Sequence, residues 1–370
     1  MNDTAVSPSR SKTLDILSSS PVSGTHAALG DEVTVHLHSQ GIPLFVMPVS
    51  KRLKSNFEAF HMWLIDHEEA IEKLLLEFGA VRFRGFPVNG SEQFRDLMSH
   101  YPAAAMGYKG GGGPRAAVSG RVMEATRTDK DRYIQLHHEM CYQRQWPLKL
   151  AFYSNVVPSD GGGATTIADI RRYEAKIPQR ILDEVRKRGV LYSRNFRDGR
   201  EPTEGWTSQF LNMHRPWQEA FFTEDKAEVE AACEAGGLEW HWLDDGSLQT
   251  EARNSGFVTH PVLGTRHWFN QISNQTALPQ GDRLWHNTLT AEDLRQGKRY
   301  PNEPHFGDGG KIPAEDVELL RKLEDEVLVD EPYVPGEIMM LDNVLCVHGR
   351  TPYKGQRDTL IQLLGTGTSE

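Results

Sequence analysis

Cysteine, long apolar runs and excess positive charge are all scarce in this chain of 370 residues. Its three cysteines, Cys141, Cys233 and Cys346, are far apart and form no C-x-x-C pair, which argues against a disulfide framework and against a cysteine-based zinc site. No apolar run approaches the roughly 20 residues of a membrane span, and the N-terminus lacks the basic start and apolar stretch of a signal peptide. We therefore expect a cytoplasmic location and no membrane partner.

The balance of charge also argues against nucleic acid as a partner. A net charge of -10 at pH 7 disfavours binding to polyanions through bulk charge. The expected partner is a small molecule, either free or carried by another protein, and homo-oligomerisation is left open. Residues 1–30, rich in Ser, Thr, Pro and Ala, are expected to form a weakly ordered leader, and residues 31–370 a single domain.

The spacing of apolar and turn residues predicts the main elements. Helices are expected at about 56–78, 178–189, 224–235 and 314–328, and strands at 80–87, 150–156, 337–341 and 358–364. Residues 205–310 are expected to be an insertion between strands. This order predicts a mainly β fold with flanking helices, whose core is an antiparallel double-stranded β-helix, the jelly-roll or cupin-like architecture.

The most informative motif is His137-His138-Glu139, together with a distant histidine, His348. Two imidazoles and one carboxylate are the ligand set that non-haem Fe(II) oxygenases place on one face of the metal. In an extended segment residues i and i+2 point the same way, so His137 and Glu139 can face one metal while His138 faces away. The third ligand then has to come from another strand.

Spacing alone leaves other interpretations open. A H-x-E pair arises often by chance, so a structural or surface histidine is the default. His138-Glu139 also begins like the zinc-protease motif H-E-x-x-H, but Tyr142 stands where its second histidine is needed. The run KGGGGPR at 109–115 invites a phosphate-loop interpretation, but no Gly-Lys-Ser/Thr follows. A loop over an active site, or a plain surface loop, is the better expectation for that run.

Longer stretches resemble the taurine dioxygenase-like (TauD/TfdA) superfamily of Fe(II)/2-oxoglutarate oxygenases, which includes clavaminate synthase-like enzymes. The resemblance covers about 70 to 366 and is carried by FGAVRFRGFPV, SGRVMEATRTD before LHHEM, PSDGGGATTIADIRRYEAKIP and GEIMMLDNVLCVHGRTPYKGQR. It implies that His137, Glu139 and His348 bind iron. It also implies that Thr165 contacts 2-oxoglutarate and that Arg357 holds the far carboxylate of this cosubstrate.

An arginine suits the far carboxylate because its planar guanidinium can bind both oxygens at once. Arg350, in the sequence HGR, is the rival cofactor-binding residue. We expect Arg357 to bind the carboxylate and Arg350 to support the residues around it. Asp342 and Asn343 are expected to orient the loop that carries His348.

A narrower resemblance concerns the substrate. The runs HHEMCYQRQWPLKLAFYSN, WFNQ and FGDGG resemble the branch of syringomycin-biosynthesis-type hydroxylases, which act on amino-acid-like substrates, sometimes tethered to a carrier protein. The expected function is therefore a dioxygenase that uses Fe(II), 2-oxoglutarate and O2 to hydroxylate an unactivated C–H bond of a small amino-acid-like or amine-bearing molecule in specialised metabolism. Desaturation, cyclisation and epoxidation remain open, as do a zinc hydrolase with the same ligands and a non-catalytic carrier-docking protein.

Individual residues bear on the choice of substrate. Arg115, before the first iron ligand, could pair with a substrate carboxylate, and Asn270 in WFNQ could offer its amide, although a structural role is the first expectation for each. Glu139 argues against halogenation, because halogenating relatives lack this carboxylate. Ile361 stands four residues after Arg357, where relatives that bind sulfonates carry a second arginine, so taurine is not the expected substrate.

Overall fold

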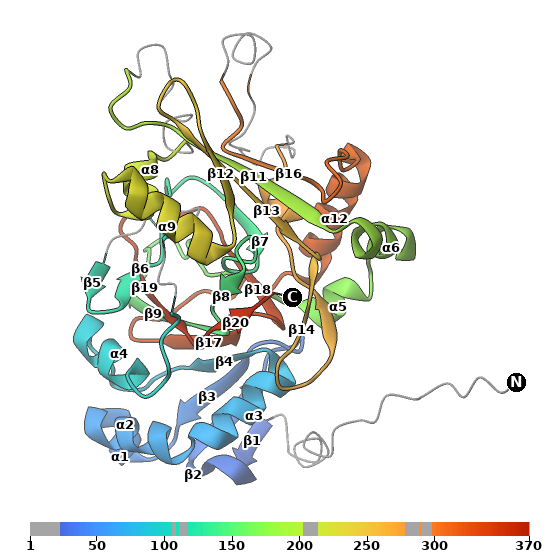
Figure 1. Ribbon diagram of the computed structural model, residues 1–370. Coiled ribbons are helices and arrows are strands. Elements are labelled where there is room, and N and C mark those ends of the chain that lie inside the picture. Colours follow the sequence, from blue (N-terminus) through green and yellow to red (C-terminus); the bar gives the residue numbers. More distant parts are fainter. Residues whose placement is uncertain are drawn as a thin grey trace, which may run out of the picture.

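A nine-stranded sheet runs through the centre of the computed structural model (Figure 1), which describes residues 23–105, 109–110, 117–126, 128–202, 214–277, 289 and 298–369. In spatial order the strands are β1 (Ser23–His26), β2 (Gly30–Leu37), β3 (Leu44–Pro48), β4 (Ala80–Phe83), β17 (Ile338–Asp342), β9 (Lys149–Val156), β19 (Asp358–Leu364), β6 (Val122–Glu124) and β5 (Ala117–Ser119). Neighbouring strands are antiparallel except β3 and β4, which are parallel. Segments far apart in the sequence therefore lie side by side.

A three-stranded sheet faces the middle of the large one. Its strands, in spatial order, are β10 (Ile167–Asp169), β18 (Cys346–Arg350) and β7 (Ile134–His137). One apolar cluster contains side chains of both sheets, including Leu150 and Ile361 from the large sheet and Leu136 and Val347 from the small one. Two sheets that share an interior in this way form the double-stranded β-helix, which confirms the predicted jelly-roll core.

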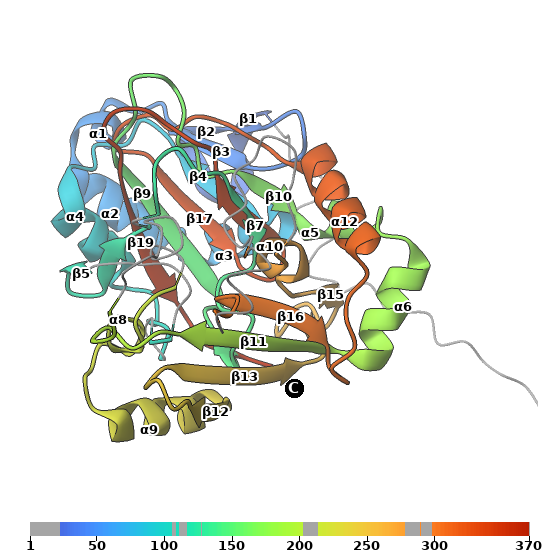
Figure 2. The ribbon, with the colours of Figure 1, turned by 90° about the horizontal axis from the view of Figure 1, so that it is seen from above.

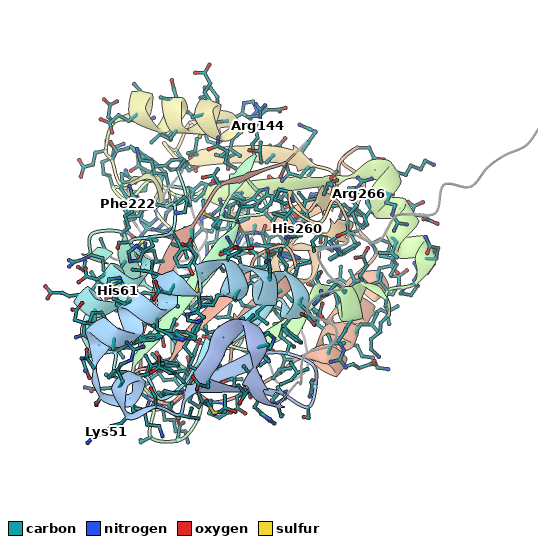
Figure 3. The ribbon with its side chains drawn as sticks, turned by 90° about the horizontal axis from the view of Figure 1, so that it is seen from below. Lys51, His61, Arg144, Phe222, His260 and Arg266 are labelled. Carbon is teal, nitrogen blue, oxygen red and sulfur yellow. The ribbon has the colours of Figure 1, made fainter. Side chains whose placement is uncertain are left out.

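Helices cover the outer face of the large sheet. They are α1 (Lys51–Ser55), α2 (Phe57–Asp66), α3 (Glu68–Phe78) and α4 (Gly90–Met98). Alternate strand residues such as Ala151 and Leu360 point to this side and pack with Leu74 of α3 and Phe94 of α4 in a second apolar cluster. In Figure 3, where the molecule is seen from below, Lys51 and His61 mark α1 and α2 on this side.

The single helix predicted over 56–78 is wrong. The chain leaves helical geometry at His67, with φ -111° and ψ 13°, so that α2 and α3 are separate helices. The imidazole of His67 forms a hydrogen bond with the carbonyl of Trp63 at 2.8 Å, which satisfies one of the last carbonyls of α2. Gly79 ends α3 in the left-handed conformation, as expected for a helix cap.

A separate four-stranded sheet forms another layer, which Figure 2 shows beside the core. Its strands, in spatial order, are β12 (Glu239–Trp242), β13 (Leu248–Asn254), β11 (Val190–Phe196) and β16 (Asn302–Phe306). Two helices, α8 (Trp217–Phe221) and α9 (Lys226–Gly236), pack against it through a third apolar cluster. Because β11 belongs to this sheet, the sheet begins upstream of the insertion expected at 205–310. The division of the chain into one domain with an insertion stays a prediction.

The remaining elements lie around these sheets. These are the helices α5 (Ile170–Glu174), α6 (Gln179–Arg188), α10 (Ile272–Gln275) and α12 (Ala314–Val327), the 3-10 turn η1 (Ala27–Leu29), and the strand pairs β14 (Phe257–Thr259) with β15 (Arg266–Trp268) and β20 (Gly367–Thr368) with β8 (Gln145–Trp146). Where α10 meets α12, the Ser273 hydroxyl donates to the buried carboxyl of Glu324. Burial raises the pKa of Glu324 to about 8.

Most of the other predicted elements are present. The strands expected at 150–156 and 358–364 are β9 and β19, and the helices expected at 178–189 and 314–328 are α6 and α12. Of the expected leader, residues 1–22 lie outside the described residues, whereas residues 23–30 form β1, η1 and the first residue of β2. Among the described helices, none is long and apolar enough to cross a membrane.

Candidate functional site

Three side chains that can bind a metal meet at the small sheet. His137 ends β7, Glu139 lies in the turn after it, and His348 lies in β18. The two strands are antiparallel, with His137 directly opposite His348, and the ring centroids are 4.3 Å apart. One donor atom from each of the three residues lies within 4.8 Å of the others. Cross-strand pairing thus unites residues that are far apart in the sequence.

Hydrogen bonding and packing orient the two imidazoles. Nδ1 of His137 donates to the carbonyl of Gln135 at 2.8 Å, which leaves Nε2 for a metal. The amide of Asn274 donates to the same carbonyl. The ring of His348 packs against Phe152, with centroids 5.3 Å apart, and its Nε2 lies 3.6 Å from the Glu139 carboxylate. Both rings therefore present a nitrogen to one space.

Asn343 holds the backbone of Glu139 in place. Its side-chain oxygen accepts the Glu139 N–H at 2.8 Å, and its side-chain nitrogen donates to the carbonyls of Glu139 and Pro147 at 3.0 and 2.8 Å. The neighbouring Asp342 accepts the backbone N–H groups of Val344 and Leu345 and lies 2.9 Å from His260. The pair Asp342 and Asn343 thus orients the segment leading to His348, as expected, and also fixes Glu139.

The geometry around Glu139 departs from the simple strand argument. β7 ends at His137, and Met140 has a left-handed backbone with φ 57°, so Glu139 reaches the site from a turn. His138 does face away: its Nδ1 donates to the Asn343 carbonyl at 2.6 Å and its ring packs against Phe269. Burial lowers the pKa of His138 to about 4, so this imidazole is neutral.

Arg357 and Thr165 lie together beside this group. Nε of Arg357 donates to the Gly163 carbonyl at 2.7 Å, and a terminal nitrogen lies 3.5 Å from the Thr165 hydroxyl. Because β10 pairs with β18 so that Ile167 is opposite His348, Thr165 is only two residues from the partner of a metal-site histidine. Burial lowers the pKa of Arg357 from the usual value of an arginine.

The glycines of the preceding turn make room for Arg357. A Cβ on Gly163, whose φ is +70°, would lie 2.9 Å from Cδ of Arg357, and a Cβ on Gly162 would lie 2.5 Å from the Pro352 carbonyl oxygen. A side chain at either position would push the 350s loop away. The glycines of the DGGG run therefore leave the space that the Arg357 side chain and the adjoining loop occupy. A motif match alone does not reveal this role.

Arg350 has a different environment. Its terminal nitrogens donate to the backbone carbonyls of Thr128, Asp129 and Arg132, and the bonds to Thr128 and Arg132 are both 2.9 Å long. These carbonyls accept the terminal N–H donors that a carboxylate would need. Arg350 therefore holds the segment 128–132, an arrangement that argues against its cofactor-binding role.

The two tentative substrate residues receive no support from the structure. Arg115 lies outside the described residues. Asn270 is buried, with its side-chain nitrogen donating to the Gly256 carbonyl and its oxygen accepting the Ile272 N–H. Both polar groups of Asn270 are thus engaged by backbone, as is typical of a structural residue. Of the 109–115 run, only residues 109–110 are described.

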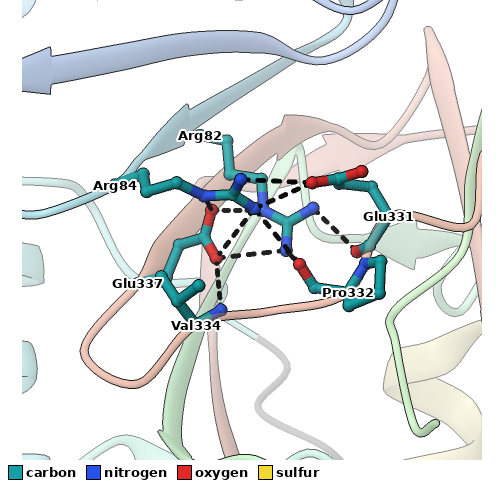
Figure 4. Close-up of polar contacts among 6 residues, drawn as sticks. All are labelled: Arg82, Arg84, Glu331, Pro332, Val334 and Glu337. Atoms are coloured by element: carbon teal, nitrogen blue, oxygen red, sulfur yellow. Dashed lines mark hydrogen bonds and ion pairs between the residues drawn. The ribbon is translucent and has the colours of Figure 1, made fainter. Parts of the chain in front are cut away.

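A buried ion-pair network went unnoticed in the sequence. Figure 4 shows Arg82 and Arg84 of the β4 segment meeting Glu337, with Glu331 and Pro332 alongside. Nε of Arg82 lies 2.6 Å from the Glu337 carboxylate, and both side chains are almost fully buried. The alternation in AVRFRGFP indicated a strand, but alternation cannot tell which face is buried. The sequence signal for this network is Glu337, a single glutamate immediately before a strongly apolar strand.

The donor set fits a divalent cation. Among the described residues, His137, Glu139 and His348 are the one group of three or more His, Cys, Asp or Glu that could hold a metal. Glu139 and His348 are buried, so a bound cation would offset the cost of burying the Glu139 carboxylate. Three protein ligands from one side leave coordination positions open, as in non-haem iron oxygenases.

Comparison with known proteins gives a consistent family. The family described as taurine catabolism dioxygenase TauD, TfdA family matches residues 47–364. A clavaminate synthase-like protein of Arabidopsis thaliana is 29% identical over 340 residues, which is 89% of this chain and 95% of that protein. The dapdiamide synthesis protein DdaC of Enterobacter agglomerans is 31% identical over 301 residues, 80% of this chain and 84% of that protein.

Among solved structures, AAD-2 in complex with Mn(II) and N-oxalylglycine is similar over 91% of this chain and 99% of its own, with 12% identity and a TM-score of 0.49. The family match extends over most of the chain and includes every residue of the His-Glu-His group as well as Thr165 and Arg357. The chain therefore belongs to the TauD/TfdA family of dioxygenases, which use iron and 2-oxoglutarate.

Proposed function

We propose that His137, Glu139 and His348 bind Fe(II), that Arg357 and Thr165 hold 2-oxoglutarate, and that the enzyme hydroxylates an unactivated C–H bond of a small amino-acid-like or amine-bearing molecule. One observation carries the proposal. The three metal-binding side chains meet within 4.8 Å at the edge of the small sheet, and the β10 strand of this sheet begins close to Thr165, which Arg357 contacts.

The protein's own residues have separable tasks in this scheme. Iron, when bound, supplies the oxidising chemistry, in which O2 and 2-oxoglutarate are consumed and succinate and CO2 are formed. Arg357 offers a cation and Thr165 a hydroxyl to the distal carboxylate. Phe152, which packs against His348, contributes an apolar wall that limits water beside the metal. Desaturation, cyclisation or epoxidation would use the same groups and differ in which substrate atom is presented.

The substrate class is narrowed by what the interior lacks. Ile361, where sulfonate-binding relatives would carry an arginine, is fully buried in the apolar cluster and is opposite Phe152 on β9. No cation from that position is available for a sulfonate. The likeness to a protein named for dapdiamide synthesis supports a biosynthetic rather than a taurine-degrading role. The three free, buried cysteines support a reducing compartment such as the cytoplasm.

The test is oxygen consumption by purified protein with Fe(II) and 2-oxoglutarate, measured together with succinate formation. Free amino acids, amines and the same compounds tethered to a carrier protein form the substrate panel, with taurine as the expected negative. A zinc hydrolase would instead work with Zn(II) and without O2. A non-catalytic docking protein would give no succinate above the level of the His137→Ala variant, a result that would refute the proposal.

A further inference from the structure

The pocket at Arg357 contains hydroxyl groups that the fold itself does not use. It is lined by residues of β9 and β19, the glycine turn and the segment before β17, including Ser154, Gly163, Tyr333, Arg357 and Thr359. The Tyr333 hydroxyl is buried and makes no hydrogen bond of good geometry to any described residue, and the same is true of the Ser154 hydroxyl. Buried polar groups are almost always paired, so such a hydroxyl points to a missing partner.

Tyr333 is held rigidly in this position. Its side chain is 8% exposed, and the Arg82 guanidinium lies over its ring at 4.4 Å from the centroid. Arg82 is in turn fixed by Glu337 and by the carbonyls of Glu331 and Pro332, the residues immediately before the tyrosine (Figure 4). The ion-pair network therefore sets both the backbone and the ring of Tyr333.

The hydroxyl end of Tyr333 faces the cosubstrate residues. Burial raises the pKa of Tyr333 above the usual value for tyrosine, and the nearby Arg82, Thr165 and Arg357 only partly offset this increase. The group is therefore protonated at neutral pH and can donate a hydrogen bond. The donors of Arg82 are already engaged by Glu337 and backbone carbonyls, so Arg82 is not itself available to an anion.

We propose that Tyr333 donates a third hydrogen bond to the distal carboxylate of 2-oxoglutarate, beside Arg357 and Thr165, and that the pair Arg82 and Glu337 positions it. This inference rests on the proposed function, because it assigns a further residue to the same cosubstrate site. A carboxylate at this point would give the buried hydroxyl a strong acceptor, which none of the described side chains supplies in good geometry.

The test is Tyr333→Phe, which keeps the ring under Arg82 and removes only the hydroxyl. Calorimetric titration of the Mn(II)-loaded protein would compare 2-oxoglutarate with 2-oxobutyrate, a keto acid that lacks the distal carboxylate. Tyr333→Phe should weaken 2-oxoglutarate binding by about 10-fold to 100-fold, the usual value of a hydrogen bond to a charged group, and leave 2-oxobutyrate binding unchanged. Tyr101→Phe is the matched control, because Tyr101 is also buried with an unpaired hydroxyl but packs under the helices.

A thermal measurement separates binding from structure. Without ligand, the melting temperature of Tyr333→Phe should equal or exceed that of wild type, since the variant loses a buried hydroxyl. Added 2-oxoglutarate should raise the melting temperature of the variant by less than it raises that of wild type. Unchanged affinity for 2-oxoglutarate, or an equal loss for both keto acids, would overturn the assignment of Tyr333. Arg357→Ala tests the foundation separately: if that variant binds 2-oxoglutarate normally, the proposed cosubstrate site itself is wrong.

Discussion

Single residues of the same type have different contacts here, and these contacts determine which role each can take. Arg350 and Arg357 lie on the same side of the molecule, seven positions apart in the sequence, and both are close to the Tyr353 ring. The first donates to three backbone carbonyls, whereas the second faces a threonine hydroxyl and a pocket. Both arginines are candidate cosubstrate ligands in the sequence. The sequence does not show which hydrogen-bond partners each has, because tertiary packing sets those partners.

The first prediction concerns the metal ligands. Replacing His137, Glu139 or His348 with Ala should abolish turnover and weaken Mn(II) binding by more than roughly 100-fold, because one of only three protein ligands is lost. Calorimetry and metal content after dialysis measure this directly. His305→Ala, on β16 of the separate sheet, is the control and should bind metal normally. Wild-type metal affinity in the His348 variant would remove that residue from the ligand set.

The second prediction separates the two arginines. Arg357→Ala should leave the distal carboxylate unpaired at a cost of about 2 to 5 kcal/mol, or roughly 30-fold to several thousand-fold in 2-oxoglutarate affinity. Arg357→Lys should also lose affinity, because a point charge cannot bind both oxygens. Arg350→Ala should lower stability but keep the cosubstrate affinity within a few fold. The reverse outcome, with Arg350 essential and Arg357 dispensable in titrations, would exchange their roles.

At the scale of elements, strand register and turns determine the site. β18 lies between β7 and β10, so one strand brings His348 to His137 on one side and to the Thr165 segment on the other. A shift of β18 by one residue would turn His348 to the opposite face. The glycine turn and Asn343 then fix what the strands cannot, namely Arg357 and Glu139.

The third prediction uses two neighbouring glycines with similar backbone. Gly161 and Gly163 have φ +73° and +70°, so alanine is strained at both, but only at Gly163 would its Cβ approach Arg357. Gly163→Ala should therefore raise the Kd for 2-oxoglutarate by about 10-fold or more, whereas Gly161→Ala should cost stability alone. Melting temperature and calorimetry on both variants provide the comparison. Equal affinities in the two would show that the turn does not support the arginine.

The fourth prediction concerns Asn343. Asn343→Ala removes the two hydrogen bonds that the Asn343 amide makes with the backbone N–H and carbonyl of Glu139, at about 0.5 to 1.5 kcal/mol for each bond. Metal affinity should fall by about 10-fold to 100-fold, because the carboxylate is no longer oriented. Asn195→Ala in β11, which removes a buried asparagine bonded to the Tyr300 carbonyl, should destabilise the fold without affecting metal binding. If stability and metal affinity both decrease in both variants, the loss of metal affinity reflects general destabilisation, and Asn343 has no specific role in orienting Glu139.

At the scale of the whole molecule, the sequence predicted the core architecture and candidate residues for the site. It did not predict the surrounding residues that hold the site in place. His137 and Glu139 share a short spacing motif, whereas His348, Thr165 and Arg357 are indicated by the resemblance to the TauD/TfdA family, and their roles stay proposals. Arg82 and Glu337 could not be found this way, because strand periodicity does not reveal that the polar side of β4 is buried against a distant glutamate. The membership of β11 in the separate sheet likewise depends on contacts between remote segments.

The fifth prediction links stability to pH through Glu324, at the contact of α10 and α12. Its pKa in the folded state is about 8, raised by burial from 4.5, so between these values the unfolded chain releases a proton that the folded chain keeps. This contribution is complete below pH 4.5 and is lost as pH rises through 8, at about 1.4 kcal/mol per pH unit. Denaturant unfolding at several pH values should show Glu324→Gln gaining on wild type as pH rises. Glu318→Gln, on the exposed side of α12, should track wild type, and parallel curves for Glu324→Gln would contradict the assignment.

The interleaved order of strands has a consequence for biosynthesis. β7 leaves the ribosome long before β18, and β4 and β9 are separated in the large sheet by β17, which is made late. A nascent chain therefore holds the H-x-E pair without its distant histidine, and the sheet stays divided until the C-terminal strands arrive. Assembly of the metal centre must wait until β18 has been made, so a product truncated before β18 lacks one of the three proposed ligands.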